Sequence, residues 1–370
     1  MSSRRLSAVV LAAGEGARMR STRPKPLHLL CGRAMVLYVL DALPAPEIDR
    51  AVVVVGHGAE RVTKKLTEDS AGLALEFVEQ HHQKGTGDAL AVGLTGLADD
   101  DDDDDRDVLV VPGDTPLLRP ETVAALVAEH RHSGAACTIL TAVVDDPTGY
   151  GRIVRVGNDD KIARIVEQAD ATPDEVGIRE INTGIFCFRR NLLAPALRLV
   201  HPDNVQGEYY LTDVVEVLAE AGHKVVSLAA DDPAETAGVN DRNQLANAEA
   251  RLRARTNREW LARGVTMVDP ASTYIDTTVT LAADVTIFPG AILQGRTVIG
   301  QGVEIGPGCR LVDCTVGEHT TLEHTVGRYS EIGADCEVGP YAALEAGSRI
   351  PSGTRTGPFY TATTAAGLDD

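Results

Sequence analysis

The segment from Leu6 to Arg33 contains the residue types that bind phosphate groups. A short apolar run ends at Ala13, and a loop that contains glycine follows it. Within eight residues this loop carries four cations: Arg18, Arg20, Arg23 and Lys25. Glycine lets a backbone approach a ligand closely, free N–H groups can point at phosphate oxygens, and cations offset their charge. The loop therefore predicts a site for an anionic ligand.

This loop matches neither of two common phosphate-binding motifs. Its core, Gly14-Glu15-Gly16-Ala17-Arg18, lacks the third glycine of the dinucleotide fingerprint, and no Gly-Lys-Ser/Thr of a P-loop follows. A glycine turn after a strand can also be a plain turn. The cations and the Pro24-Lys25-Pro26 that follows favour phosphate binding.

Three further segments supply polar groups that a nucleotide site needs. The loop from Glu79 to Gly87 carries amide side chains that could read a nucleobase edge. Asp114 directly follows an apolar run, where a Mg²⁺ bound to phosphates would find a hard oxygen ligand. Asn182 and Asn240 stand at the ends of apolar runs. Each residue also has a plain structural interpretation, because Asp and Asn favour turns and helix caps.

The charge balance argues against a nucleic-acid partner. The 370 residues include 35 Lys and Arg against 54 Asp and Glu, a net charge of −19. Such a surface repels a phosphate backbone, so we expect no polynucleotide binding. The length favours roughly two domains.

The cysteines and the amino terminus indicate a cytoplasmic protein. No C-x-x-C pair occurs, so we predict buried, reduced thiols rather than a zinc cluster or disulfides at Cys31, Cys137, Cys187, Cys309, Cys314 and Cys336. No long apolar segment follows the amino terminus, so we expect neither a signal peptide nor a membrane span.

Up to about Val239, apolar runs alternate with helical stretches, which predicts a mainly parallel sheet covered by helices. The predicted strands include Ala51–Val55, Leu75–Val78, Val108–Val111, Cys137–Val143 and Gly184–Phe188. The predicted helices include Met35–Leu43, Gly87–Gly96, Glu121–His130 and Leu211–Ala221. In such sheets the ligand lies beyond the carboxyl ends of the strands, where the opening loop and Asp114 are expected.

Two charged segments interrupt or end this pattern. The seven aspartates from Asp99 to Asp105 cannot pack, and we expect a solvated loop rather than a metal site. Residues 241–264 have helical composition and end in glycine. If continuous, they form a connecting arm of roughly 36 Å.

After this arm the sequence repeats every six residues. Aliphatic residues recur at Ile275, Leu281, Ile287, Leu293, Ile299, Ile305 and Leu311. A second row of small or β-branched residues has the same spacing at Val279, Val285, Ala291, Thr297, Val303, Cys309 and Thr315. The phase then slips by three residues, and the pattern resumes at Val326, Ile332, Val338, Leu344 and Ile350. This repeat predicts a parallel β-helix, followed by a frayed tail that begins near Ser352.

Taken together, the motifs of the first 240 residues resemble one family. They are L-A-A-G-x-G-x-R-M (11–19), P-K-P (24–26), Q-x-x-Q-x-G-T-G (80–87), G-D-T-P-L-L (113–118), G-Y-G-R-I (149–153), I-V-E (165–167), E-I-N-T-G-I (180–185), G-E-Y-Y-L-T-D (207–213) and G-V-N (238–240). The chain resembles the bifunctional N-acetylglucosamine-1-phosphate uridyltransferase/glucosamine-1-phosphate acetyltransferase family of bacterial cell-wall precursor synthesis. The resemblance covers about residues 6–350.

The resemblance implies an α/β Rossmann-like nucleotidyltransferase domain (1–240), a linker helix (241–264), a short left-handed β-helix that forms homotrimers (265–355) and a flexible tail (356–370). The implied reaction joins UTP and N-acetylglucosamine 1-phosphate and releases pyrophosphate. The nucleotide would be held by Leu11, Ala12, Ala13, Gly14, Lys25, Gln80, Gln83, Gly85 and Thr86. Catalytic charge would come from Arg18 and Lys25, with Mg²⁺ on Asp114 and Asn240. The amino sugar would contact Gly151, Glu167, Asn182 and Tyr210.

The chain departs from the family in the β-helix. In the family, the acetyl-transfer site uses a basic segment after G-P-F and a histidine on further coils. Here Ala343 and Glu345 replace the arginines of that segment, and the chain ends about 20 residues later. His319 and His324 lie in an earlier coil, where we expect surface or turn positions. We therefore expect no acetyltransferase activity.

Three alternatives stay open from the sequence. The first keeps the reaction but changes the sugar phosphate or the base, since a few hydrogen bonds can discriminate one substituent. The second is a non-catalytic, trimeric regulatory paralogue, for which degraded site residues would be the signature. The third is an acyltransferase that acts through the β-helix, which the missing basic and histidine residues disfavour.

Overall fold

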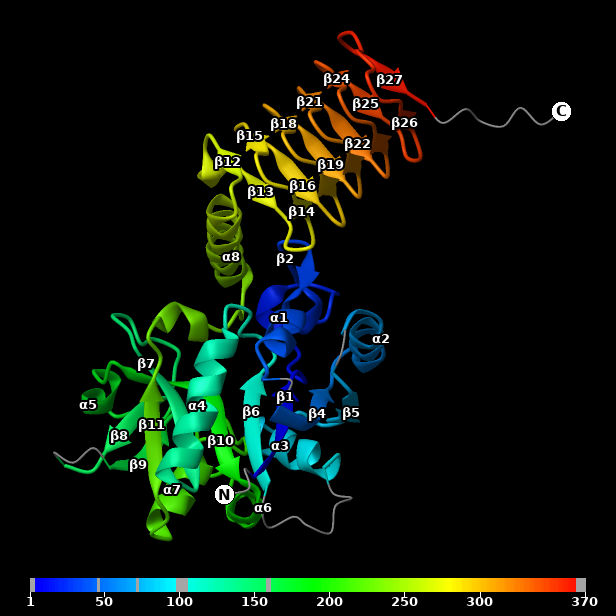
Figure 1. Cartoon of the computed structure of the whole chain (residues 1–370). Coiled ribbons are helices and arrows are strands. Elements are labelled where there is room, and N and C mark those ends of the chain that lie inside the picture. Colours follow the sequence, from blue (N-terminus) through cyan, green and yellow to red (C-terminus); the bar gives the residue numbers. More distant parts are fainter. Residues whose placement is uncertain (1–3, 45–46, 71–72, 98–105, 158–160, 364–370) are drawn as a thin grey trace. The chain divides into compact units, whose positions relative to one another are not determined.

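The computed structural model describes residues 4–44, 47–70, 73–97, 106–157 and 161–363 (Figure 1). The aspartate run Asp99–Asp105 therefore lies outside the described residues. The chain forms two compact units, Met1–His28 with Ala34–Leu245, and Leu29–Arg33 with Ala246–Asp370. Residues 29–33 belong to the second unit and contain β2 (Leu29–Leu30) and the first residue of β3 (Arg33–Ala34), and these two strands pair with each other. Each unit therefore consists of two separate stretches of sequence, which a single predicted domain boundary cannot describe.

A nine-stranded sheet forms the centre of the first unit. Its strands are β1 (Arg5–Leu11), β4 (Ile48–Val55), β5 (Leu75–Glu79), β6 (Arg106–Pro112), β7 (Cys137–Val143), β8 (Arg152–Arg155), β9 (Ile162–Val166), β10 (Glu180–Arg189) and β11 (Val225–Ala229). Seven of them follow the order β11-β7-β10-β6-β1-β4-β5, and β8 and β9 form a hairpin beside β10. The prediction of a mainly parallel sheet is confirmed, with β10 antiparallel to both β6 and β7.

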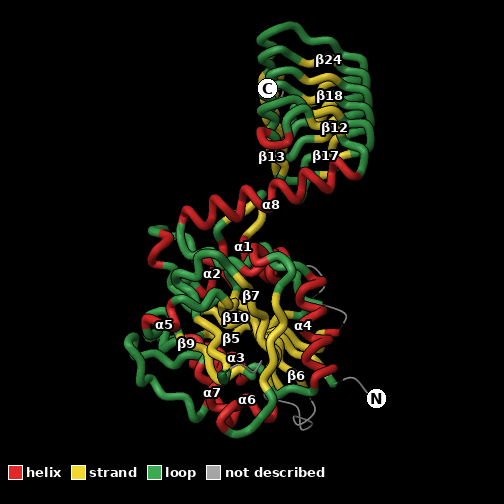
Figure 2. The backbone as a smooth tube through the Cα atoms, turned by 90° about the vertical axis from the view of Figure 1, so that its left-hand side faces the viewer, coloured by secondary structure: helices red, strands yellow, loops and turns green. Residues whose placement is uncertain are grey.

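Helices cover both faces of this sheet (Figure 2). They are α1 (Met35–Asp41), α2 (Ala59–Asp69), α3 (Thr86–Thr95), α4 (Pro120–Ser133), α5 (Pro173–Val176), α6 (Arg190–Leu197) and α7 (Asp213–Glu220). Side chains alternate along a strand, so Ala8 and Val10 of β1 pack with α1, α2 and α4. Val9 packs on the opposite face with α3, α6 and α7. Both faces are therefore buried, which explains the unbroken apolar runs of the strands.

The parallel strands β1, β4, β5 and β6 are neighbours, so their carboxyl ends share one edge of the sheet. The loop after β1 begins at Ala12, the loop after β5 begins at Gln80, and the loop after β6 contains Asp114. This edge therefore gathers three of the predicted ligand-binding segments, as expected for an open α/β sheet.

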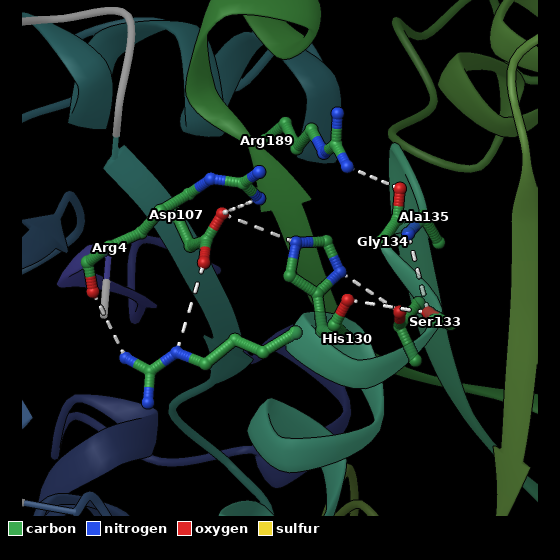
Figure 3. A network of polar contacts seen from close by, with 9 residues as sticks. Arg4, Asp107, His130, Ser133, Gly134, Ala135 and Arg189 are labelled. Carbon is green, nitrogen blue, oxygen red and sulfur yellow. Dashed lines mark hydrogen bonds and ion pairs between the residues drawn. The ribbon is translucent and has the colours of Figure 1, made fainter. Parts of the chain in front are cut away.

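A buried polar network lies at the opposite edge of the sheet (Figure 3). Asp107, at the start of β6, is fully buried, 3.4 Å from His130 Nε2 and 3.6 Å from the Arg4 guanidinium. His130 Nδ1 is 2.9 Å from Thr138 Oγ1, which links α4 to β7. Asp107 lies near the start of β6 and Asp114 lies in the loop after its end, so most of the length of the strand, roughly 17 Å, separates the two residues. We therefore assign this network to the packing of α4 rather than to ligand binding.

The second unit is the predicted left-handed parallel β-helix, preceded by the helix α8 (Arg242–Ala262). Its strands are β12 (Thr266–Met267), β13 (Tyr274–Ile275), β14 (Thr280–Leu281), β15 (Thr286–Ile287), β16 (Ile292–Gln294), β17 (Val298–Ile299), β18 (Glu304–Ile305), β19 (Arg310–Val312), β20 (Thr315–Val316), β21 (Thr321–Leu322), β22 (Val326–Arg328), β23 (Glu331–Ile332), β24 (Glu337–Val338), β25 (Ala343–Leu344), β26 (Arg349–Ile350) and β27 (Thr361–Ala362). Every third strand stacks in parallel, which gives sheets of five, six and five strands. The six cysteines of the chain are free and buried, as predicted.

The predicted register of the β-helix is wrong between Leu311 and Ile332, whereas the predicted interior positions Ile332, Val338, Leu344 and Ile350 are confirmed. The interior position opposite Leu311 is Gly327, and the expected Val326 points outward with 44% of its surface exposed. Cys314, rather than the exposed Thr315, continues the second interior row. Between Leu311 and Ile332, three of the intervals between successive interior residues are five residues long instead of six. Together these three shortened intervals account for the three-residue shift in phase. A fixed period cannot anticipate these shortened corners, and a one-residue shift turns a strand side chain to the other face.

The coils also extend beyond the predicted boundary at residue 355. β27 pairs with β25, and Ala362 is buried in the β-helix core. The Gly- and Thr-rich composition suggested a tail here, but backbone ladder bonds do not require large side chains. None of the helices in the described part of the chain combines the length and apolarity that a bilayer crossing needs.

Candidate active site

A cavity of about 410 Å³ opens at the carboxyl edge of the sheet in the first unit. Twelve of the sixteen predicted site residues line it: Leu11, Ala12, Ala13, Gly14, Lys25, Gln80, Gln83, Gly85, Thr86, Asp114, Glu167 and Asn182. They come from segments distributed over about 170 residues of sequence. The cavity therefore combines the predicted nucleotide, metal and sugar positions in one place.

Gly14 and Gly16 in the opening loop are required for different structural reasons. A Cβ on Gly14 would meet no atom within 4 Å, so this residue leaves its side of the cavity open to a ligand. Gly16 has a φ of +70°, and a Cβ there would lie 2.8 Å from Lys25 Cβ. Only glycine fits this backbone conformation without strain. Gly16 therefore lets the loop pack against the stem of Lys25.

Lys25 connects the opening loop to the two predicted metal ligands. Its Nζ donates a hydrogen bond to Asn240 Oδ1 at 2.7 Å and forms an ion pair with Asp114. Only 14% of the Lys25 side chain is exposed. The three residues are far apart in sequence, and the fold alone brings them together. The oxygen atoms of Asp114 and Asn240 therefore bind a positive charge at this point.

Asp114 and Asn240 are suitable for holding Mg²⁺. Both present oxygen atoms, the ligand type that Mg²⁺ prefers, and both already converge on one cation, the Lys25 ammonium. Among the described residues no group of three or more His, Cys, Asp or Glu side chains could bind a metal alone.

The predicted base-binding loop is held in place by its neighbours. Gln80 is 5% exposed, and its Nε2 donates hydrogen bonds to Asp88 Oδ2 at 2.8 Å and to Gly85 O at 3.3 Å. Gln83 Nε2 donates to Ala13 O at 2.9 Å, which joins this loop to the opening loop. Gly85 has a φ of +112°, and a Cβ there would lie 2.5 Å from Tyr209 O. The loop is therefore closely packed around its glycine.

Glu167 and Asn182, two of the predicted sugar contacts, also line the cavity. Burial raises the pKa of Glu167, while a hydrogen bond from Thr212 Oγ1 to its Oε1, at 3.0 Å, acts in the opposite direction. Gly151 lies beside this carboxylate, since a Cβ on it would be 3.4 Å from both Glu167 oxygens. The Asn182 backbone N–H donates to Gly151 O at 2.9 Å. The strands β8, β9 and β10 thus position these residues together.

The structure does not place four of the predicted residues in the cavity wall. Gly151 and Asn240 lie next to residues that do line it. Arg18 is exposed on a short 3₁₀ turn (Ala17–Met19). Tyr210 is 7% exposed, and burial first, then the nearby Asp170 carboxylate, raises the pKa of its phenol to about 12.

Sequence reasoning missed Thr212, which lines the cavity and binds Glu167. It also missed Asp88, the hydrogen-bond partner of Gln80. Thr212 belongs to the same G-E-Y-Y-L-T-D motif as Tyr210, so the motif contains its signal but does not distinguish the two residues. Asp88 directly follows Gly85-Thr86-Gly87 and lies in the first turn of α3. Acidic residues are common in the first turn of a helix because they interact favourably with the helix dipole. Nothing in the sequence separates that role from a contact with Gln80.

The fold and the cavity define a nucleotidyltransferase with an appended left-handed β-helix. Residues 8–266 match the family model of the MobA-like NTP transferase domain. The chain is 47% identical over 351 residues to the "Bifunctional protein GlmU" of Streptomyces avermitilis, covering 95% of this chain and 72% of that protein. It is 44% identical over 355 residues to the protein of the same name from Brevibacillus brevis, covering 96% and 75%. The chain belongs to the GlmU family.

Proposed function

We propose that the cavity converts UTP and N-acetylglucosamine 1-phosphate into UDP-N-acetylglucosamine and pyrophosphate with the help of Mg²⁺. The observation that carries the proposal is the convergence of Lys25, Asp114 and Asn240 between the base-binding loop and Glu167. The family membership supports the nucleotidyl transfer.

The reaction brings two anions together. A phosphate oxygen of the sugar 1-phosphate forms a bond to the α-phosphorus of UTP, and the bond from this phosphorus to the bridging oxygen breaks, which releases pyrophosphate. Mg²⁺ on Asp114 and Asn240 would offset the phosphate charge. Lys25 supplies a further positive charge from a largely buried side chain, where it is weakly screened. No covalent nucleophile on the protein is needed.

The sugar is oriented by Glu167 and Asn182, which line the cavity. Glu167 can accept hydrogen bonds from sugar hydroxyls or from the amide N–H of an N-acetyl group. Thr212 holds the Glu167 carboxylate in place from behind. The buried position of Glu167 makes an unpaired contact costly, so the site favours a substrate with a matching donor.

We propose further that the described coils of the β-helix carry no acetyl-transfer site. Ala343 on β25 and Glu345, which directly follows this strand, are exposed at the positions where the family is basic. A neutral and an acidic side chain cannot provide the positive charge of that segment. Homotrimerisation through the β-helix is part of the same proposal, and light scattering of the purified chain tests it.

A substrate panel with pyrophosphate detection tests the main proposal. Purified full-length chain is given UTP, CTP, ATP or GTP with several sugar 1-phosphates, with and without Mg²⁺. We expect fastest release from UTP with N-acetylglucosamine 1-phosphate and none after EDTA. Asp114→Ala should abolish turnover, whereas Asp145→Ala, with a side chain that is 98% exposed, is the control. Turnover of no pair would instead support a non-catalytic paralogue, and acetylation of glucosamine 1-phosphate would refute the second proposal.

A further inference from the structure

The Gln80 side-chain amide has a fixed orientation. Both partners of its Nε2, the Asp88 carboxylate at 2.8 Å and the Gly85 carbonyl at 3.3 Å, are hydrogen-bond acceptors. A flipped amide would place its oxygen against two other oxygens. The NH₂ group must therefore face Asp88 and Gly85.

This orientation leaves one polar atom of Gln80 for a ligand. Gln80 lines the cavity, and Oε1 receives no hydrogen bond from the described residues. Oε1 is not one of the buried side-chain atoms that lack a partner, so it is not cut off from solvent. Gln80 therefore presents only a hydrogen-bond acceptor, Oε1, to the cavity, because its NH₂ donor group is already bound to Asp88 and Gly85.

We propose that Asp88 is a positioning residue that sets the pyrimidine specificity of the nucleotide site. It holds Gln80 Oε1 toward the cavity, where this oxygen accepts the N3–H of uracil. Cytosine carries an acceptor at N3, so the same oxygen repels it. The inference rests on the proposed function, because it takes the Gln80 loop as the base-binding side of the cavity.

The carboxylate matters here because it can only accept hydrogen bonds. An asparagine at position 88 has nearly the same shape, but its amide can accept from the Gln80 NH₂ or donate to a flipped Gln80 oxygen. Asp88 lies in the first turn of α3, where a negative charge also favours the helix. Asp88→Asn therefore keeps the packing and the contact but removes the shorter of the two contacts that admit only an NH₂ group, so that the Gly85 carbonyl at 3.3 Å alone opposes a flipped amide. Asp88→Ala weakens the preference for one orientation in the same way by deleting the partner.

The experiment measures UTP and CTP side by side. For wild type, Asp88→Asn and Asp88→Ala, kcat/KM for both nucleotides is determined by pyrophosphate release with N-acetylglucosamine 1-phosphate. Calorimetry with each nucleotide alone gives the dissociation constants without turnover. Glu60→Gln is the matched control, because Glu60 is an exposed acid in the first turn of α2.

We expect the UTP-to-CTP ratio of kcat/KM to fall about tenfold in Asp88→Asn, mainly through better use of CTP, with no change in Glu60→Gln. The dissociation constants should show the same shift. An unchanged ratio in both Asp88 variants, or an equal loss for both nucleotides, overturns the inference and leaves the proposed function standing. If wild type binds nucleotides without turnover, the calorimetric ratio still decides the inference while the proposed function fails.

Discussion

Replacing Lys25 by methionine removes one positive charge from the cavity and keeps most of the side-chain volume. The Nζ of Lys25 is bound to Asp114 and Asn240, and the stem packs against Gly16. Methionine keeps the stem contact but cannot pair with Asp114. The substitution therefore separates the contribution of charge from that of packing.

The size of the effect follows from burial. Two unit charges about 4 Å apart at an effective dielectric constant of about 20 interact by about 4 kcal/mol, which corresponds to roughly a thousandfold in rate. With only 14% of the side chain exposed, water cannot replace the ammonium. Loss of one stabilising group in an active site typically reduces kcat by 10²–10³. We therefore expect kcat/KM to fall by about two to three orders of magnitude in Lys25→Met.

Steady-state pyrophosphate release with saturating Mg²⁺ measures this loss, and thermal unfolding checks the fold. Only 24% of the Asp114 side chain is exposed, so leaving this carboxylate without its partner should cost about 1–3 kcal/mol of stability. Lys64→Met, on the exposed surface of α2, is the control. A kcat/KM within threefold of wild type, in a variant that stays folded, would refute the role given to Lys25.

Three further predictions concern stability and substrate binding. Asp213→Asn should raise the free energy of unfolding by about 1–2 kcal/mol at pH 7.5, because burial first and then the neighbouring carboxylates raise the folded-state pKa of Asp213 from 3.8 to about 6. Because the pKa of Asp213 is higher in the folded than in the unfolded state, its ionisation makes the folded state less favourable as the pH rises from about 4 through 6. Urea unfolding at pH 4 should therefore show no difference in unfolding free energy between Asp213→Asn and wild type. An equal stabilisation at pH 4 and pH 7.5 would contradict this explanation. Gly85→Ala should raise the KM for UTP at least tenfold, since a Cβ would lie 2.5 Å from Tyr209 O, and an unchanged KM would show that the loop adapts. Leu293→Ala, at a fully buried position of the β-helix, should lower the unfolding free energy of that unit by about 2–5 kcal/mol without changing kcat, as fluorescence-detected unfolding and pyrophosphate release can verify.

The sequence by itself determined the architecture where a pattern repeats regularly. Buried parallel strands require unbroken apolar runs, and a β-helix with equal coils requires one aliphatic residue every six positions. Both patterns were sufficient to predict the sheet, the coils up to Leu311 and the interior positions from Ile332 onward. The apolar runs favour a parallel sheet as a whole but do not single out one reversed strand, so the antiparallel β10 could not be predicted. Nor could the shortened coils, since an aliphatic repeat favours Val326 in the interior, whereas the structure turns it outward and places Gly327 inside.

Only the tertiary structure decided which polar side chains meet. Lys25, Asp114 and Asn240 each follow a recognisable motif, but their pairing depends on loops that the parallel strands bring to one edge of the sheet. The contacts of Thr212 with Glu167 and of Asp88 with Gln80 are of the same kind. A motif records the residue types that a ligand needs, because those types carry the chemistry. The orientation of each side chain is set by neighbours that are distant in sequence, so it becomes visible only when the chain is folded.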